Sequence, residues 1–128
     1  MDIQLSEHFW LSEFECKDGT NFVELELVEK LEQLRKLLNV PIVITSGYRS
    51  KEYNDSLIKR GYKASPNSKH IQGRAVDIQK FDGFSDSFIE QLASLVGFKG
   101  IGIYDNFYHL DIREKLINTV GRDYDRWG

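Results

Sequence analysis

The spacing of apolar residues predicts an amphipathic helix early in the chain. Over residues 23–38 the apolar side chains fall on one face and charged residues fill the other. The apolar face consists of Leu27, Val28, Leu31, Leu34, Leu37 and Leu38. Before this helix, Ser12 is followed three residues later by Glu15, and this capping-box spacing predicts a short helix.

Residues that favour helix ends predict two further helices. Ser50 can cap a helix that runs to about position 60 and is closed by Gly61. Ser85 or Asp86 can open a helix that runs to about position 96, where Gly97 stops it.

Four segments have the pattern of strands. After Pro41, the β-branched run IVIT predicts a short buried strand. Residues 62–73 are rich in turn formers and predict a loop, and the alternating RAVDIQ that follows predicts the second strand. GIGIY and FYHLDI predict a hairpin joined at Asp105 and Asn106, whereas the tail GRDYDRWG predicts no regular element.

Helices mixed with an antiparallel strand pair favour the α+β class. With 128 residues and no repeat or long linker, the chain predicts a single domain over residues 1–128, which we expect to be a monomer. Hydrophobic residues make up 41% of it, as in a globular protein. The net charge of −3 argues against nucleic acid as the main partner.

The single cysteine, Cys16, excludes an internal disulfide framework and a cysteine-rich zinc module, and we interpret it as a small buried apolar residue. The first ten residues have neither a basic nor an apolar leader region, and no apolar run approaches the length of a membrane span. We therefore expect cytoplasmic synthesis without a signal peptide, and no insertion into a membrane.

Three histidines introduce the question of a metal, because a catalytic zinc ion takes three protein ligands and leaves a fourth position to water. His70 and His109 lie beside predicted strands. Alternation places Asp77 on the face of its strand opposite the apolar residues, and His109 shares a face with Asp111. His8 lacks such a pattern and is interpreted as a surface or packing residue. From spacing alone, hydrogen-bonded structural histidines are the commoner interpretation.

The segment SGYRS places Arg49 at the end of a predicted strand, where sites often form. A guanidinium can hold a carboxylate through two parallel hydrogen bonds. An ordinary surface ion pair is the commoner role for such a residue. Tyr48, Tyr104 and Tyr108 are candidates to line a groove, although aromatic residues in so small a domain are usually core.

Together, SGYRS, SKHIQGRAVDI and YHLDIR resemble in order and spacing the zinc D-Ala-D-Ala carboxypeptidases and related murein peptidases of the Hedgehog/DD-peptidase fold. Ser68, Gly73 and Ala75 complete the family pattern S-x-H-x-x-G-x-A-x-D. LSEFEC and the helix after it are similar to the start of the D-Ala-D-Ala carboxypeptidase branch. The resemblance extends from about residue 9 to residue 113.

The resemblance implies a small α+β sandwich whose antiparallel sheet carries a zinc site. It implies cleavage of peptide bonds that involve D-amino acids in bacterial cell-wall stem peptides. Arg49 would bind the peptide carboxylate or stabilise the oxyanion. The implied zinc ligands are His70, Asp77 and His109, and the implied substrate-binding residues are Tyr48, Arg49 and Ser68.

The resemblance leaves the general base open. Several branches place a carboxylate three residues before the last zinc histidine, where this chain has Asn106. We favour Asp111, since residues two apart on one strand face are separated by about 6.6 Å, within reach of a zinc-bound water, and Asp105 is the second candidate. An equal alternative is that Asp111 orients a ligand histidine or pairs with Arg49 or Arg113.

The favoured function is a zinc murein peptidase, and a phage or prophage lysis protein released through a holin fits this chain. A cellular enzyme that acts on recycled muropeptides is also open. The competing hypothesis is a non-catalytic, zinc-containing peptidoglycan-binding or virion-associated module. A fourth protein ligand closing the site would favour the module, and an open position beside a carboxylate would favour the enzyme.

Overall fold

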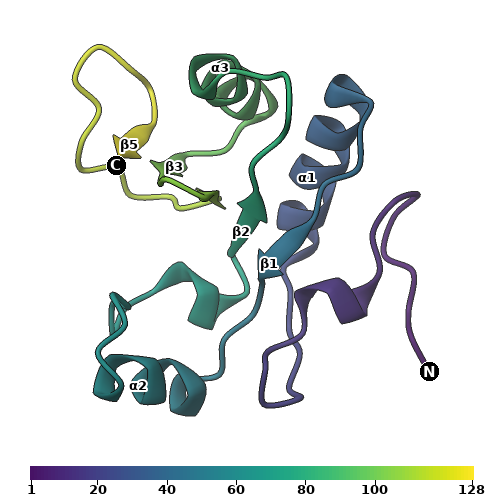
Figure 1. Cartoon of the computed structure of the whole chain (residues 1–128), viewed down its shortest axis with the longest axis vertical. Coiled ribbons are helices and arrows are strands. Elements are labelled where there is room, and N and C mark those ends of the chain that lie inside the picture. The colour runs from purple at the N-terminus through teal and green to yellow at the C-terminus, as the bar shows by residue number, and fades with distance from the viewer.

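A five-stranded sheet in the order β1-β2-β4-β3-β5 organises the computed structural model, which describes residues 1–128 (Figure 1). Neighbouring strands among the first four are antiparallel, and β5 is parallel to β3. The strands are β1 (Ile44–Ser46), β2 (Ala75–Gln79), β3 (Gly100–Ile103), β4 (Phe107–Asp111) and β5 (Asp125–Trp127). The mixture of helices with this sheet confirms the α+β class.

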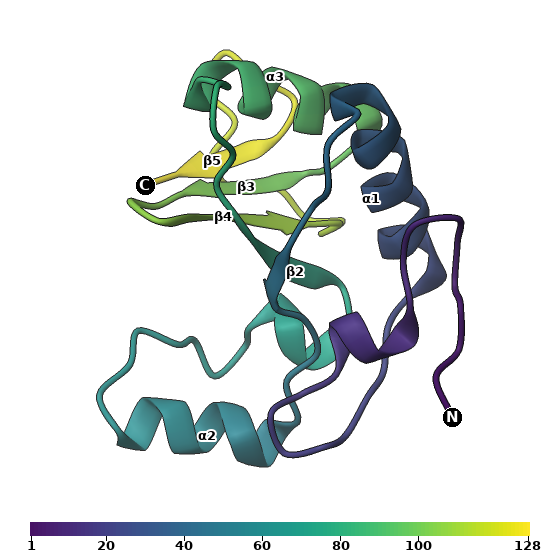
Figure 2. The ribbon, with the colours of Figure 1, turned by 45° about the vertical axis from the view of Figure 1, so that its right-hand side comes forward.

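Three α-helices and two 3-10 helices accompany the sheet. The helices are η1 (Leu11–Phe14), α1 (Leu25–Leu38), α2 (Lys51–Lys59), η2 (Lys69–Gln72) and α3 (Asp86–Val96). α1 and α3 contact each other and contribute to one buried core with β2, β3 and β4, while α2 lies apart at the far end of the molecule (Figure 2). None of the helices combines the length and the apolar character needed to cross a bilayer.

The helix ends follow the predicted capping residues. The Ser50 hydroxyl accepts a hydrogen bond from the Tyr53 amide at 3.1 Å, and α2 begins at the next residue. Ser85 rather than Asp86 caps α3, because its hydroxyl accepts from the Phe88 amide at 3.1 Å. Local capping chemistry therefore fixes both helix starts.

The apolar face of α1 is buried with one exception. Leu37 is 52% exposed, so its assignment to the core face was wrong. It lies at the flank of the stripe, beside Leu34 and Leu38, which are buried. Glu32 is buried instead, because its carboxylate accepts hydrogen bonds from Ser6 and from the backbone of His8. Cys16 is buried, as expected.

Two local predictions differ from the structure, and one agrees with it. Glu13, not Glu15, caps the N-terminus of η1, because its carboxylate accepts a hydrogen bond from the Trp10 amide at 2.8 Å. The Ser12 hydroxyl does not cap the helix but donates to Asp2. The β3–β4 hairpin has the predicted link, since the Tyr104 amide donates to the carbonyl of Phe107 and encloses only Asp105 and Asn106. β1 begins two residues later than predicted.

The C-terminal tail was predicted to be irregular, and this was wrong. Residues 125–127 form β5 beside β3, and Figure 1 shows this strand at the edge of the sheet opposite β1. Three residues are too few to display a periodic pattern, so pairing with β3 rather than local sequence defines this strand.

Candidate metal centre

The sheet brings together two of the three predicted ligands. Asp77 on β2 and His109 on β4 are direct cross-strand partners, so their side chains leave the sheet on the same face. Val76 and Ile78 point the other way, into the core. The third residue, His70, comes from η2, the short helix that leads into β2.

His70 is held by backbone groups. Its Nδ1 lies 2.7 Å from the carbonyl oxygen of Gly47. Because a carbonyl only accepts, Nδ1 carries the proton and Nε2 presents a lone pair. Gly47 is itself packed on Phe14, where a Cβ would approach the Phe14 Cα to 2.6 Å. The glycine of SGYRS is therefore required for the close approach that positions His70.

The two imidazoles converge on one oxygen of the Asp77 carboxylate. Asp77 Oδ1 lies 3.2 Å from His70 Nε2 and 3.1 Å from His109 Nδ1. The three ligand atoms all lie within 4.8 Å of one another. In a tetrahedral zinc site with bonds of about 2.0–2.1 Å, ligand atoms are about 3.3 Å apart. The donor set and its spacing therefore fit a zinc ion.

Protonation also suits a metal site. Burial lowers the pKa of His70, and the hydrogen bond to Asp77 opposes this only in part, so the ring is neutral at neutral pH. Burial would raise the pKa of Asp77, but the hydrogen bond from His109 and the close contact with the His70 ring hold it well below its usual range. A neutral imidazole and an ionised carboxylate are the forms that bind metals.

Side chains hold the second histidine, His109. Its Nε2 lies 2.7 Å from Asp111 Oδ2, which leaves Nδ1 directed at Asp77. Arg113 donates two hydrogen bonds to the same carboxylate, from Nε at 2.8 Å and from Nη2 at 2.7 Å. Burial would raise the pKa of Asp111, but Arg113 and His109 keep it far below its usual range.

This arrangement does not fit Asp111 as the general base. The residue is fully buried, both of its oxygens are occupied, and it does not line the cleft described below. The structure favours the alternative, a carboxylate that orients a ligand histidine. Asp105 and Asn106 are exposed on the β3–β4 loop, and they too lie outside the residues that line the cleft.

Arg49 is built into the site. Its Nη2 lies 3.4 Å from Asp77 Oδ2, and its Nη1 donates to Asn54 Oδ1 at 3.4 Å. Only 16% of its side chain is exposed, which is inconsistent with an ordinary surface ion pair. The sequence analysis did not identify Asn54 as a residue of the site. It is fully buried on α2, and it also donates to the Ser65 carbonyl at 2.8 Å.

The three ligands face a cleft of about 820 Å³. Tyr48, Ser68 and Tyr104 line it, whereas Tyr108 is buried in the core and donates to Asp86. The lining includes five cationic residues against two carboxylates. The cations are Lys17, Arg49, Lys63, Lys69 and Arg113, and the carboxylates are Glu15 and Asp77.

Two histidines and a carboxylate beside an open cleft form the ligand set typical of a catalytic zinc site. No fourth histidine, cysteine or carboxylate joins the cluster. A zinc ion held by these three groups would keep a fourth position for water, which is the arrangement expected of the enzyme rather than of a closed structural module.

The chain belongs to the peptidase M15 family, whose model matches residues 7–111. Over 89 residues it is 34% identical to the peptidoglycan L,D-endopeptidase MepK of Escherichia coli K12, and equally to that of Shigella flexneri. The alignment covers 66% of this chain and 48% of each relative, so the chain spans about half the length of these curated relatives. The predicted resemblance to metallopeptidases is confirmed.

Proposed function

We propose that this chain is a zinc-dependent peptidase that cleaves bonds to D-amino acids in peptidoglycan stem peptides. The observation that carries the proposal is the convergence of His70, His109 and Asp77 on one point that faces a cleft. The M15 family match and the peptidoglycan endopeptidases among the relatives support it.

The proposed roles follow from the geometry. His70 and Asp77 hold zinc with His109, and zinc would supply a Lewis acid that polarises the scissile carbonyl and activates water. Arg49 lies against Asp77 with its guanidinium in the cleft, where it can bind a substrate carboxylate or the developing oxyanion. Tyr48 and Ser68 would contact the peptide from the cleft wall.

The charge of the cleft supports an acidic substrate. Lys17, Lys63 and Lys69 add to Arg49 and Arg113 around the site. Stem peptides carry several carboxylates, and a cationic cleft concentrates and orients such ligands.

For the general base, Asp105 remains our candidate among the two carboxylates predicted from the sequence. It is solvent exposed on the β3–β4 loop, whereas Asp111 is enclosed by Arg113 and His109. Asp105→Asn should lower turnover by at least about a hundredfold if it carries the proton. Zinc affinity, measured in parallel, should not change.

The test of the function is incubation of the zinc-loaded protein with purified muropeptides, with products identified by mass. Separate substrates that contain D-Ala-D-Ala termini, L,D cross-links or D,D cross-links would reveal the bond that is cut. Product in the zinc sample and none after chelator is the expected result. A protein that binds zinc and muropeptides without forming product would instead be a binding module.

Where the enzyme acts is a further part of the proposal. Peptidoglycan lies outside the cytoplasmic membrane, so the protein would need a route to the wall, and release through a holin by a phage or prophage is one such route. Recycled muropeptides in the cytoplasm are the alternative substrate. Activity on intact sacculi rather than on soluble muropeptides alone would favour the lysis role.

A further inference from the structure

Two rows of residues cross four strands on the site face of the sheet. The strand register sets them side by side, from β2 through β4 and β3 to β5. The first row is Asp77, His109, Gly102 and Trp127, and the second row is Ala75, Asp111, Gly100 and Asp125. β5, which lies beyond the family-matched residues 7–111, is therefore aligned with the metal ligands.

The two glycines of β3 make contact across it possible. A Cβ at Gly100 would overlap the Asp111 carboxylate and approach Arg113 Nε to 2.5 Å. A Cβ at Gly102 would lie 2.6 Å from the indole nitrogen of Trp127. The site face of β3 thus provides room in which side chains from β4 and β5 meet.

Asp125 is the anchor on β5. It is buried, and its Oδ1 accepts from the backbone amides of Ile117 at 2.8 Å and Asn118 at 2.5 Å. Its Oδ2 accepts from Arg113 Nη1 at 3.2 Å. The other edge of the Arg113 guanidinium binds Asp111, which in turn contacts His109.

Trp127 covers this chain of contacts. Arg113 lies 4.7 Å from the centre of the Trp127 ring, and the His109 ring lies 5.3 Å from it. The indole nitrogen donates to the Tyr104 hydroxyl at 2.7 Å. The tryptophan therefore limits the movement of both Arg113 and His109.

We propose that β5 contributes to the metal centre through Asp125, which acts as a positioning residue. Through Arg113 and Asp111, it holds the His109 ring with Nδ1 toward Asp77 and the metal. A carboxylate partner of this kind fixes the tautomer and orientation of a ligand histidine. Any effect of Asp125 on hydrolysis rests on the proposed function. The effect on metal affinity does not, and it is the quantity that the test measures first.

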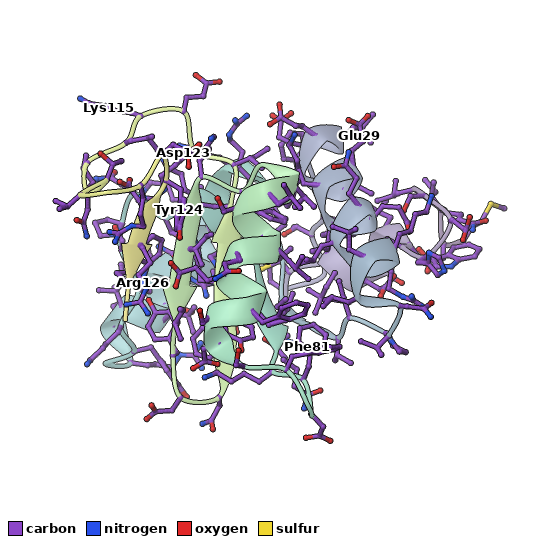
Figure 3. All side chains as sticks on the ribbon, turned by 90° about the horizontal axis from the view of Figure 1, so that it is seen from above. Glu29, Phe81, Lys115, Asp123, Tyr124 and Arg126 are labelled. Atoms are coloured by element: carbon purple, nitrogen blue, oxygen red, sulfur yellow. The ribbon has the colours of Figure 1, made fainter.

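The test compares Asp125→Asn with Glu90→Gln. Glu90 on α3 holds β5 from the opposite face, through Arg126 Nε at 3.2 Å and the Tyr124 hydroxyl. Figure 3 labels Tyr124 and Arg126 at this edge of the sheet, near α3. Glu90→Gln therefore weakens the attachment of β5 without altering the contacts among Asp125, Arg113 and Asp111.

Zinc affinity would be measured by competition with a chromophoric chelator, and the site geometry by the visible spectrum of the cobalt-loaded protein. Asp125→Asn should bind zinc about tenfold more weakly, at the low end of the range for outer ligand partners, with an altered cobalt spectrum. Glu90→Gln should match the wild type in both. Unchanged zinc affinity in Asp125→Asn, or an equal loss in Glu90→Gln, would overturn the proposal.

Circular dichroism of each metal-free variant checks folding. If Asp125→Asn does not fold, Arg113→Lys replaces it, because lysine keeps the charge but lacks the planar fork that binds Asp111 through two nitrogens while a third reaches Asp125. The same tenfold loss is expected, and wild-type affinity would contradict the inference. A wild type that binds zinc tightly but hydrolyses no muropeptide would refute the proposed function and leave this inference standing.

Discussion

The two histidines of the centre are held in contrasting ways. Backbone fixes His70, since its ring donates to the Gly47 carbonyl and its own carbonyl accepts from the Arg49 amide at 3.1 Å. A series of charged side chains, Asp111 and Arg113 with Asp125 behind them, fixes His109. The position of His70 therefore depends on backbone contacts within the loops of the sequence motifs. The position of His109 depends on ion pairs with residues from a distant part of the chain.

Loss of a ligand should have the largest effect and should not distinguish the two halves. His70→Ala and His109→Ala each remove one of three ligands, so we expect zinc binding and muropeptide hydrolysis to be lost. Zinc content after dialysis and product formation measure these outcomes. His8→Ala is the matched control, because His8 pairs with Glu32 away from the site. If it caused the same loss, the assignment of ligands would fail.

Loss of the carboxylate partner should affect the His109 half alone. Asp111→Asn removes the negative charge that Arg113 and His109 share and leaves one oxygen in place of two to accept from both, so His109 is oriented less firmly. Zinc affinity should fall by about 10–100-fold. Titration with a competing chelator measures this fall. If affinity stayed at the wild-type value while turnover fell by about a hundredfold, Asp111 would be the base after all.

A change at Arg49 should affect substrate more than metal. Arg49→Lys keeps the charge, but it loses the planar fork that contacts Asn54 and faces the cleft. We expect kcat/KM to fall by about tenfold or more, corresponding to about 1.4 kcal/mol. Steady-state kinetics at saturating zinc would measure the change. A large loss of zinc affinity with unchanged kcat/KM would mean that Arg49 acts through Asp77 instead.

The smallest effect is a difference in pH dependence between the histidines of the metal-free protein. The pKa of His70 lies below its usual value because of burial, so its contribution to stability is lost as pH falls below about 6.5. Burial would lower the pKa of His109, but Asp111 and Asp77 raise it above the usual value. Its contribution is therefore present below about pH 6.5 and is lost as pH rises through the folded pKa.

Titration of both rings by NMR, with chelator present, would test this contrast. The ring of His109 should retain its proton to higher pH than the ring of His70. Identical titration curves would show that Asp111 and Asp77 do not set the pKa of His109.

The same contrast explains how much the sequence predicted. The first half of the site is contiguous in motifs, so the resemblance of SGYRS and SKHIQGRAVDI to the family was sufficient to place Arg49, His70 and Asp77 together. Strand alternation correctly placed His109 on the same face as Asp77.

The second half could not be predicted from the sequence because long-range pairing creates it. Nothing local distinguishes Asp125 and Trp127 in the tail, and only the parallel register with β3 sets them opposite Gly100 and Gly102. The GIGI pattern indicated a strand, but the structure was needed to show that its glycines leave room for other side chains. Asp111 was the favoured base from the sequence because the bidentate contact with Arg113, which argues against that role, is not visible in a pattern.

The central claim, that His70, Asp77 and His109 hold one zinc ion with a position left open, is tested most directly by X-ray absorption at the zinc edge of the loaded protein. We predict one zinc per chain with four ligands in total, two of them imidazoles and two of them oxygens, one from the carboxylate and one from exchangeable water. A protein that takes up no zinc, or a zinc ion whose four ligands all come from protein side chains, would contradict the account.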